Sequence, residues 1–76
     1  MLEKIEVICK YEYSGDILPL EIIWHDGQRF KIDRILQVCP FTGKNNEGIT
    51  RRYTCMIHQH RRYLYFSKKY WYVERI

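Results

Sequence analysis

Two short aromatic runs near the end of the chain limit the possible fold more strongly than any other feature. Residues 63–66 read Tyr-Leu-Tyr-Phe and residues 70–73 read Tyr-Trp-Tyr-Val, and each run follows a pair of basic residues. Aromatic and β-branched side chains favour strands, in which successive side chains point to opposite faces of the sheet. The runs therefore predict two strands with one core face and one tyrosine-rich outer face. The core face would carry Leu64, Phe66, Trp71 and Val73, and the outer face Tyr63, Tyr65, Tyr70 and Tyr72.

The beginning of the chain carries two further strand signals. Apolar and polar residues alternate over residues 2–13, which is typical of a half-buried strand. Residues 14–16 supply turn chemistry, and Pro19 restricts the strand that follows to a sheet edge or to the start of a strand. The inward side chains predicted for these two strands are Ile5, Val7, Cys9, Tyr11, Leu20, Ile22 and Trp24.

Asp26-Gly27 is the strongest local signal in the sequence. This dipeptide accepts the positive φ angles of a type I′ turn, so it predicts a tight hairpin between residues 21–25 and a strand over residues 28–39. The apolar phase of the second arm falters at Arg34 and Ile35. We therefore expect this arm to bend, or to carry a bulge, at that point.

The remaining segments complete an all-β pattern. Residues 41–48 are polar and contain glycine, which predicts the longest loop, and residues 50–59 predict a strand that ends in a turn near residues 59–61. No helical period of useful length appears. The prediction is a small antiparallel barrel of five to six strands, SH3-like, or a highly curved sheet, because closure protects strand edges from aggregation. A flat sheet packed on a partner chain is the alternative.

The length allows one small domain, residues 1–76, near the size at which a single hydrophobic core is only just sufficient. Its charge is distributed unevenly. Residues 1–38 hold five Lys/Arg and seven Asp/Glu, a net charge of −2, whereas residues 39–76 hold eight and two, a net charge of +6. Such a one-sided field steers a protein toward nucleic acid, an anionic membrane surface or an acidic partner. A merely solubilising surface is the alternative.

The sequence also predicts a location. No apolar run is long enough to cross a bilayer, and no apolar segment typical of a secretory signal follows Met1. Cys9, Cys39 and Cys55 are an odd number of cysteines and lack the dense spacing of a disulfide framework. We therefore expect a cytoplasmic protein with reduced thiols and no membrane partner.

Sites for metal or catalysis are poorly supported. Cys39 lacks a second ligand about three positions away, and on a regular strand Cys55 and His58 would face opposite ways, so only His58 and His60 could share a face. The thiols lie in or near the apolar phase of predicted strands, with no helix N-terminus to lower a thiol pKa. Paired acids and phosphate-binding glycine motifs are absent from the sequence. We therefore expect no metal, no cofactor, no catalytic residue and no enzymatic activity.

The basic and aromatic face of the last strands is the functional signal that remains. Single-stranded nucleic acid is bound by aromatic rings that stack on bases and by Lys/Arg that neutralise phosphates. The candidate residues are Arg51, Arg52, Arg61, Arg62, Tyr63, Tyr65, Lys68, Lys69, Tyr70 and Tyr72. Tyr and Arg are also enriched in protein interfaces, and tyrosines on a sheet stabilise cross-strand pairs. Nucleic-acid binding is therefore the hypothesis, a protein-interaction or homodimeric module on the same face is the alternative, and a purely structural face is the third possibility.

Several features after Pro19 follow an order that is found in a known group of proteins. A strand with Trp24 leads into the hairpin Asp26-Gly27-Gln28-Arg29-Phe30, Arg51-Arg52-Tyr53 comes later, and an aromatic hairpin ends in Trp71-Tyr72-Val73-Glu74. In this order the chain resembles small uncharacterised bacterial β-barrel modules of SH3-like type, some of which are encoded beside, or fused to, error-prone DNA polymerases. The resemblance implies an SH3-like barrel with a non-catalytic accessory role in DNA transactions. This chain differs from the group in an added N-terminal strand and in the absence of a tryptophan pair before the Arg-Tyr run.

Overall fold

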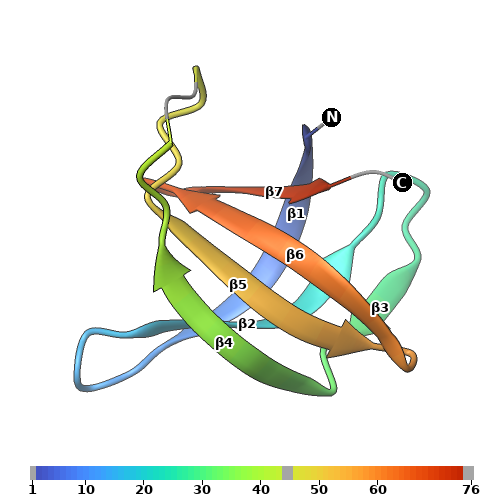
Figure 1. The fold of residues 1–76 in the computed structure, drawn as a ribbon. Helices are drawn as coiled ribbons and strands as arrows, with labels where there is room; N and C mark the ends of the chain where they lie inside the picture. The colour runs from blue at the N-terminus through green and yellow to red at the C-terminus, as the bar shows by residue number, and fades with distance from the viewer. Residues whose placement is uncertain (1, 44–45, 75–76) are drawn as a thin grey trace.

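Seven antiparallel strands form a single sheet in the part of the chain that the computed structural model describes, residues 2–43 and 46–74. The strands are β1 (Leu2–Tyr11), β2 (Ile17–Ile23), β3 (Arg29–Lys31), β4 (Arg34–Pro40), β5 (Arg51–Ile57), β6 (His60–Ser67) and β7 (Tyr70–Glu74). Their order in the sheet is β3-β2-β1-β7-β6-β5-β4, and the sheet curls into a half-barrel (Figure 1). The described residues contain no helix, which confirms the all-β prediction, and the curl of the sheet confirms the predicted strong curvature.

The sheet has one strand more than predicted, because residues 28–39 form two strands instead of one bent strand. These strands, β3 and β4, are the two edges of the sheet. Between them, the Ile32 amide donates to the Leu20 carbonyl oxygen on β2 at 2.9 Å, and the Asp33 amide donates to the Met56 carbonyl oxygen on β5 at 2.8 Å. Two consecutive residues thus hydrogen-bond to opposite ends of the sheet. This corner carries the chain across the opening of the half-barrel.

Beyond this corner, β4 carries the irregularity that the sequence predicted. Its register with β5 shifts between Ile35, which pairs with Cys55, and Gln37, which pairs with Thr54. The intervening Leu36 has no partner in this register and is exposed. A bulge of this kind increases local strand twist, in keeping with the curl of the sheet.

The core lies on the concave side of the sheet. Leu64, Phe66, Trp71 and Val73 are all buried, as the alternation predicted. Trp71 stands at the centre of an aromatic cluster, with its ring 4.8 Å from that of Phe66 and 5.1 Å from that of Tyr53, measured between ring centres. The other buried hydrophobic residues of this cluster are Ile5, Ile17, Ile22, Ile32, Cys55 and Ile57, with Val7, Cys9, Trp24, Phe30 and Ile35 packed against it.

Two of the predicted inward residues at the start of the chain are exposed instead. The register between β1 and β2 shifts at Cys9, which pairs with Pro19, and this leaves Leu20 as an extra residue on β2. Pro19 therefore points inward before the bulge and Ile22 points inward after it, whereas Leu20 points outward. Tyr11 is also exposed, in the hairpin end of β1. The inward predictions for Leu20 and Tyr11 are wrong, and Pro19 occupies a bulge, where its missing amide is tolerated.

The hairpin at Asp26-Gly27 forms, but with another turn type. Trp24 donates to the Gln28 carbonyl oxygen at 2.8 Å, and Gly27 donates to the Trp24 carbonyl oxygen at 2.9 Å. Gly27 has a φ of 90°, whereas Asp26 is not in the positive-φ region. The connection is therefore a three-residue loop with a left-handed glycine at its end, and the predicted type I′ turn is wrong.

The positive φ angles of a two-residue I′ loop occur instead between β5 and β6. His58 and Gln59 have φ values of 50° and 65°, and Ile57 pairs with His60 across them. The turn was predicted slightly later, near residues 59–61, because neither residue is typical of such a turn. Of the predicted loop at residues 41–48, positions 44 and 45 lie outside the described residues.

Candidate nucleic-acid interface

A row of four side chains crosses the outer face of the sheet over four neighbouring strands. Arg52 on β5 pairs with Tyr65 on β6, Tyr65 with Tyr72 on β7, and Tyr72 with Lys4 on β1. Residues directly opposite each other in adjacent strands have their side chains on the same face, so these four form a ladder. We call Arg52, Tyr65, Tyr72 and Lys4 the outer row. It has a basic residue at each end and two tyrosines between them.

Three cations lie near tyrosine rings on this face. The Arg52 guanidinium carbon is 4.8 Å from the centre of the Tyr63 ring, and the Lys4 ammonium nitrogen is 3.7 Å from the centre of the Tyr70 ring. The Lys69 ammonium nitrogen approaches the same Tyr70 ring at 5.5 Å. Cations at these distances are attracted to the negative face of the ring. The basic and aromatic groups thus form one interleaved surface.

Tyr65 is the least accessible of the four predicted outer tyrosines. It is buried, and the Phe41 ring packs edge-on against it with the ring centres 5.6 Å apart. Burial raises the pKa of Tyr65, and the Glu74 carboxylate adds to the increase, while the Arg52 guanidinium opposes it. Tyr65 is therefore the covered member of the outer row. Tyr63 and Tyr72 are partly exposed and Tyr70 is exposed, so these three rings are accessible.

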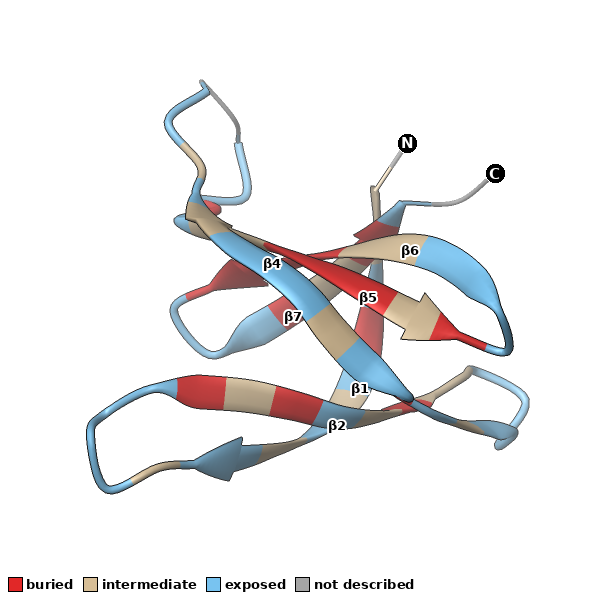
Figure 2. Cartoon of the chain, turned by 60° about the horizontal axis from the view of Figure 1, so that its bottom comes forward, coloured by how far each residue is buried: buried red, intermediate tan, exposed pale blue. Residues whose placement is uncertain are grey.

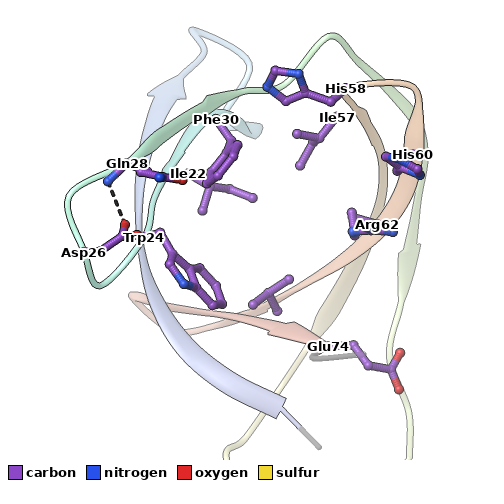
Figure 3. Close-up of a pocket in the computed structure, with 11 residues that line it drawn as sticks. Ile22, Trp24, Asp26, Gln28, Phe30, Ile57, His58, His60, Arg62 and Glu74 are labelled. Carbon is purple, nitrogen blue, oxygen red and sulfur yellow. Dashed lines mark hydrogen bonds between the residues drawn. The ribbon is translucent and has the colours of Figure 1, made fainter.

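Neighbouring arginines in the candidate set lie on opposite faces. Arg51 points to the core side, where it donates to the Tyr53 hydroxyl at 3.1 Å and lies 5.5 Å from the centre of the Phe66 ring. Arg62 also points inward and lines the cleft at one end of the half-barrel (Figure 3). Arg52 and Arg61 are on the outer face, where both line a shallow hollow beside Tyr63. The ten candidates therefore do not form one surface.

The outer cations lack acidic partners in the part of the chain that is described. The ion pairs found there join Lys10 to Glu12, His25 to Glu3 and Arg29 to Glu21, all in the first three strands and their turns. Within residues 2–43 and 46–74, no ion pair involves the outer-face cations Lys4, Arg52 and Arg61, or Lys68 and Lys69 in the turn between β6 and β7. Their charge is thus available to an anionic partner.

The sequence did not reveal that Lys4 belongs to this face. It lies in the half of the chain with net negative charge, more than sixty positions away from the tyrosines that it contacts. Only the pairing of β1 with β7 brings it there. The alternation around Ile5 indicated that Lys4 faces away from the core, but no sequence signal indicated its neighbour.

We found no assembled site for metal binding or thiol chemistry among the described residues. No group of three or more His, Cys, Asp or Glu side chains in residues 2–43 and 46–74 could hold a metal ion. Burial raises the pKa of the Cys55 thiol to about 12, so this cysteine stays protonated near neutral pH. Cys9 and Cys39 are partly buried and free.

Comparisons with protein-family models, curated proteins and solved structures found no significant match to this chain. In the described part of the chain, no helix could cross a membrane.

Proposed function

We propose that this protein is a non-catalytic module that binds single-stranded nucleic acid through the outer face of β5, β6 and β7. The observation that carries the proposal is the interleaving of accessible tyrosine rings with cations that have no acidic partner among the described residues. Bases stack on aromatic faces and phosphates are neutralised by Lys/Arg, so such a surface matches both parts of a single strand.

Each group on this surface has a distinct role in the proposal. Tyr63, Tyr70 and Tyr72 offer their rings to bases, because they are the outer tyrosines with exposed area. The cations contact the phosphate backbone of the nucleic acid in this proposal. They are Lys4, Arg52, Arg61, Lys68 and Lys69. An SH3-like barrel with an accessory role in DNA transactions, which the sequence resemblance implies, is part of the same proposal.

The test is fluorescence anisotropy with labelled single-stranded DNA, single-stranded RNA and duplex DNA over a salt series. Tyr70→Ala should weaken single-strand binding by about 1–3 kcal/mol, the effect of one stacked base. Arg61→Gln should reduce the dependence of log K on log salt by about 0.7, which corresponds to one phosphate contact fewer. Tyr13→Ala is the matched tyrosine control, because Tyr13 is fully exposed in the hairpin loop between β1 and β2.

Arg62→Gln is the matched arginine control, since it removes the same charge from the opposite face. Binding that responds to Arg61 and Tyr70 but not to Arg62 and Tyr13 supports the proposal. Salt-sensitive binding that is indifferent to Tyr70 would reduce the surface to a nonspecific basic patch. Absence of binding at low salt would refute the proposal.

A protein partner is the second candidate, and the exposure of β4 favours it. This strand is an edge of the sheet, and it is mostly exposed along its length (Figure 2). Leu36 and Val38 are exposed on it, with 41% and 45% of their surface accessible. An edge strand with apolar side chains can accept a strand from another chain, including a second copy. Light scattering over a wide concentration range tests the homodimer, and a monomer throughout would exclude it.

A further inference from the structure

The half-barrel holds a cleft that is separate from the outer face. It lies on the concave side, between the hairpin of β2 and β3 and the far ends of β5, β6 and β7, and has a volume of about 510 Å³ (Figure 3). This is within the range of pockets that bind small organic molecules, about 300–1,000 Å³. No part of the sequence indicated it, because its walls come from five strands and the turns between them.

Most of the wall is apolar. Ile22, Trp24 and Phe30 line one side, and Ile57 and Val73 line the other. In Figure 3, Trp24 and Phe30 project into the space from the same hairpin. Trp24 and Phe30 are only partly buried, although both pack against the core, so their rings have area that a ligand could cover. Flat aromatic surfaces of this kind favour a ligand with a planar apolar body.

The charged groups that line the cleft are one guanidinium and two carboxylates. Arg62 projects into the cleft from β6, and its guanidinium donates a hydrogen bond of 3.0 Å to the Arg61 carbonyl oxygen. No carboxylate of the described residues forms an ion pair with it. His58 and His60 also line the cleft.

The two acidic residues at the rim already have polar partners. The Asp26 carboxylate accepts a hydrogen bond of 2.9 Å from the Gln28 amide within the hairpin turn. Glu74 points away from the space in Figure 3, and its carboxylate lies 3.5 Å from the Tyr65 hydroxyl on the outer face. The cleft therefore combines apolar, aromatic walls with one guanidinium that forms no ion pair among the described residues.

We propose that this cleft binds a small aromatic carboxylate, with its ring against Trp24 and Phe30 and its carboxylate on Arg62. A guanidinium donates two parallel hydrogen bonds to a carboxylate, and such charge-assisted bonds are stronger than neutral ones. The proposal is independent of the nucleic-acid face, because Arg62 and Arg61 lie on opposite sides of β6.

The test compares 2-naphthoate with its neutral isostere 2-naphthamide, titrated by isothermal calorimetry and by tryptophan fluorescence. The chain has two tryptophans, and Trp71 is buried in the core, so Trp24→Phe should remove the fluorescence response. The parent should bind naphthoate about tenfold or more tightly than naphthamide, the effect of a hydrogen bond to a charged group. Arg62→Gln should abolish this preference, whereas Arg62→Lys should retain part of it.

Arg61→Gln is the matched control and should leave the preference unchanged. The proposal is overturned by the absence of saturable binding, by equal affinity for acid and amide, or by a preference that survives in Arg62→Gln. Equal losses in Arg61→Gln and Arg62→Gln would also overturn it, because they would indicate a general charge effect. Unfolding of each variant in urea shows whether the fold is retained.

Discussion

The hydroxyl of Tyr53 donates a hydrogen bond of 2.5 Å to the carbonyl oxygen of Ile17, across the core of the half-barrel. Tyr53 is on β5 and Ile17 begins β2, two strands that are not neighbours in the sheet. The hydroxyl also accepts a hydrogen bond from Arg51. One buried side chain thus links the two walls of the half-barrel at the end where the Ile32–Asp33 corner does not reach.

Tyr53→Phe should destabilise the protein by about 1–3 kcal/mol, because it leaves the Ile17 carbonyl oxygen without this partner in a buried position. Urea denaturation gives the free energy of unfolding. Tyr13→Phe removes a hydroxyl from a fully exposed ring and should change stability by less than about 0.5 kcal/mol. Equal effects of the two changes would show that the cross-core bond does not contribute.

The stability of the corner at Asp33 should depend on the Asp33 side chain as well as on its backbone amide. An Asp33 carboxylate oxygen accepts a hydrogen bond of 3.1 Å from the His58 amide and so joins the corner to the turn between β5 and β6. Asp33→Ala should cost about 0.5–1.5 kcal/mol and speed hydrogen exchange at the His58 amide. Asp33→Asn keeps an acceptor oxygen and should retain most of the protection. Unchanged exchange in Asp33→Ala would mean that the bond is not populated in solution.

The fold should become more stable when glycine replaces Gln59 in the turn between β5 and β6. Gln59 has a φ of 65°, a region that costs most residues about 1–2 kcal/mol, whereas glycine adopts it freely but loses more entropy on folding. Gln59→Gly should therefore stabilise the fold by about 0.5–1 kcal/mol. Gln37→Gly, placed in β4, should instead destabilise it. A loss of stability in Gln59→Gly would mean that the Gln59 side chain makes contacts that outweigh the backbone strain.

Stability should fall as the pH rises above 9, because burial raises the pKa of the Cys55 thiol from 9.0 to about 12. In that range the unfolded chain loses the thiol proton and the folded chain keeps it, so deprotonation stabilises the unfolded state relative to the folded state. The raised pKa values of Tyr53 and Tyr65 act in the same direction at higher pH. Urea titrations at about pH 8 and about pH 10 measure the decline. Cys55→Ala should show a smaller decline, and an equal one would assign the effect to other groups.

Local sequence patterns predicted much of the sheet correctly. The alternation over residues 63–66 and 70–73 identified the inward and outward side chains of β6 and β7, because a strand has a period of two wherever it lies. The same rule failed at Leu20, where a bulge opposite Cys9 reverses the phase. A bulge depends on the partner strand, and the neighbouring Pro19 is compatible with a bulge but does not specify one.

The sequence predicted the types of residue on the candidate face, but not the full set of residues that form it. The sequence supplied its tyrosines and four of its five cations, since those residues are close together in the chain. It also placed Arg51 and Arg62 there, although both point inward, and it omitted Lys4. Lys4 joins the face only through the pairing of β1 with β7.

The sequence by itself determined the all-β class, the phase of the aromatic strands and the separation of charge between the two halves, because each depends on residues that are neighbours in the chain. The tertiary structure decided the split of residues 28–39 into two edge strands, the cleft around Arg62 and the bond between Tyr53 and Ile17. These features join residues that are far apart in sequence. They exist because the curl of the sheet brings distant strands within hydrogen-bonding and packing distance, and no local pattern specifies which distant residues will meet.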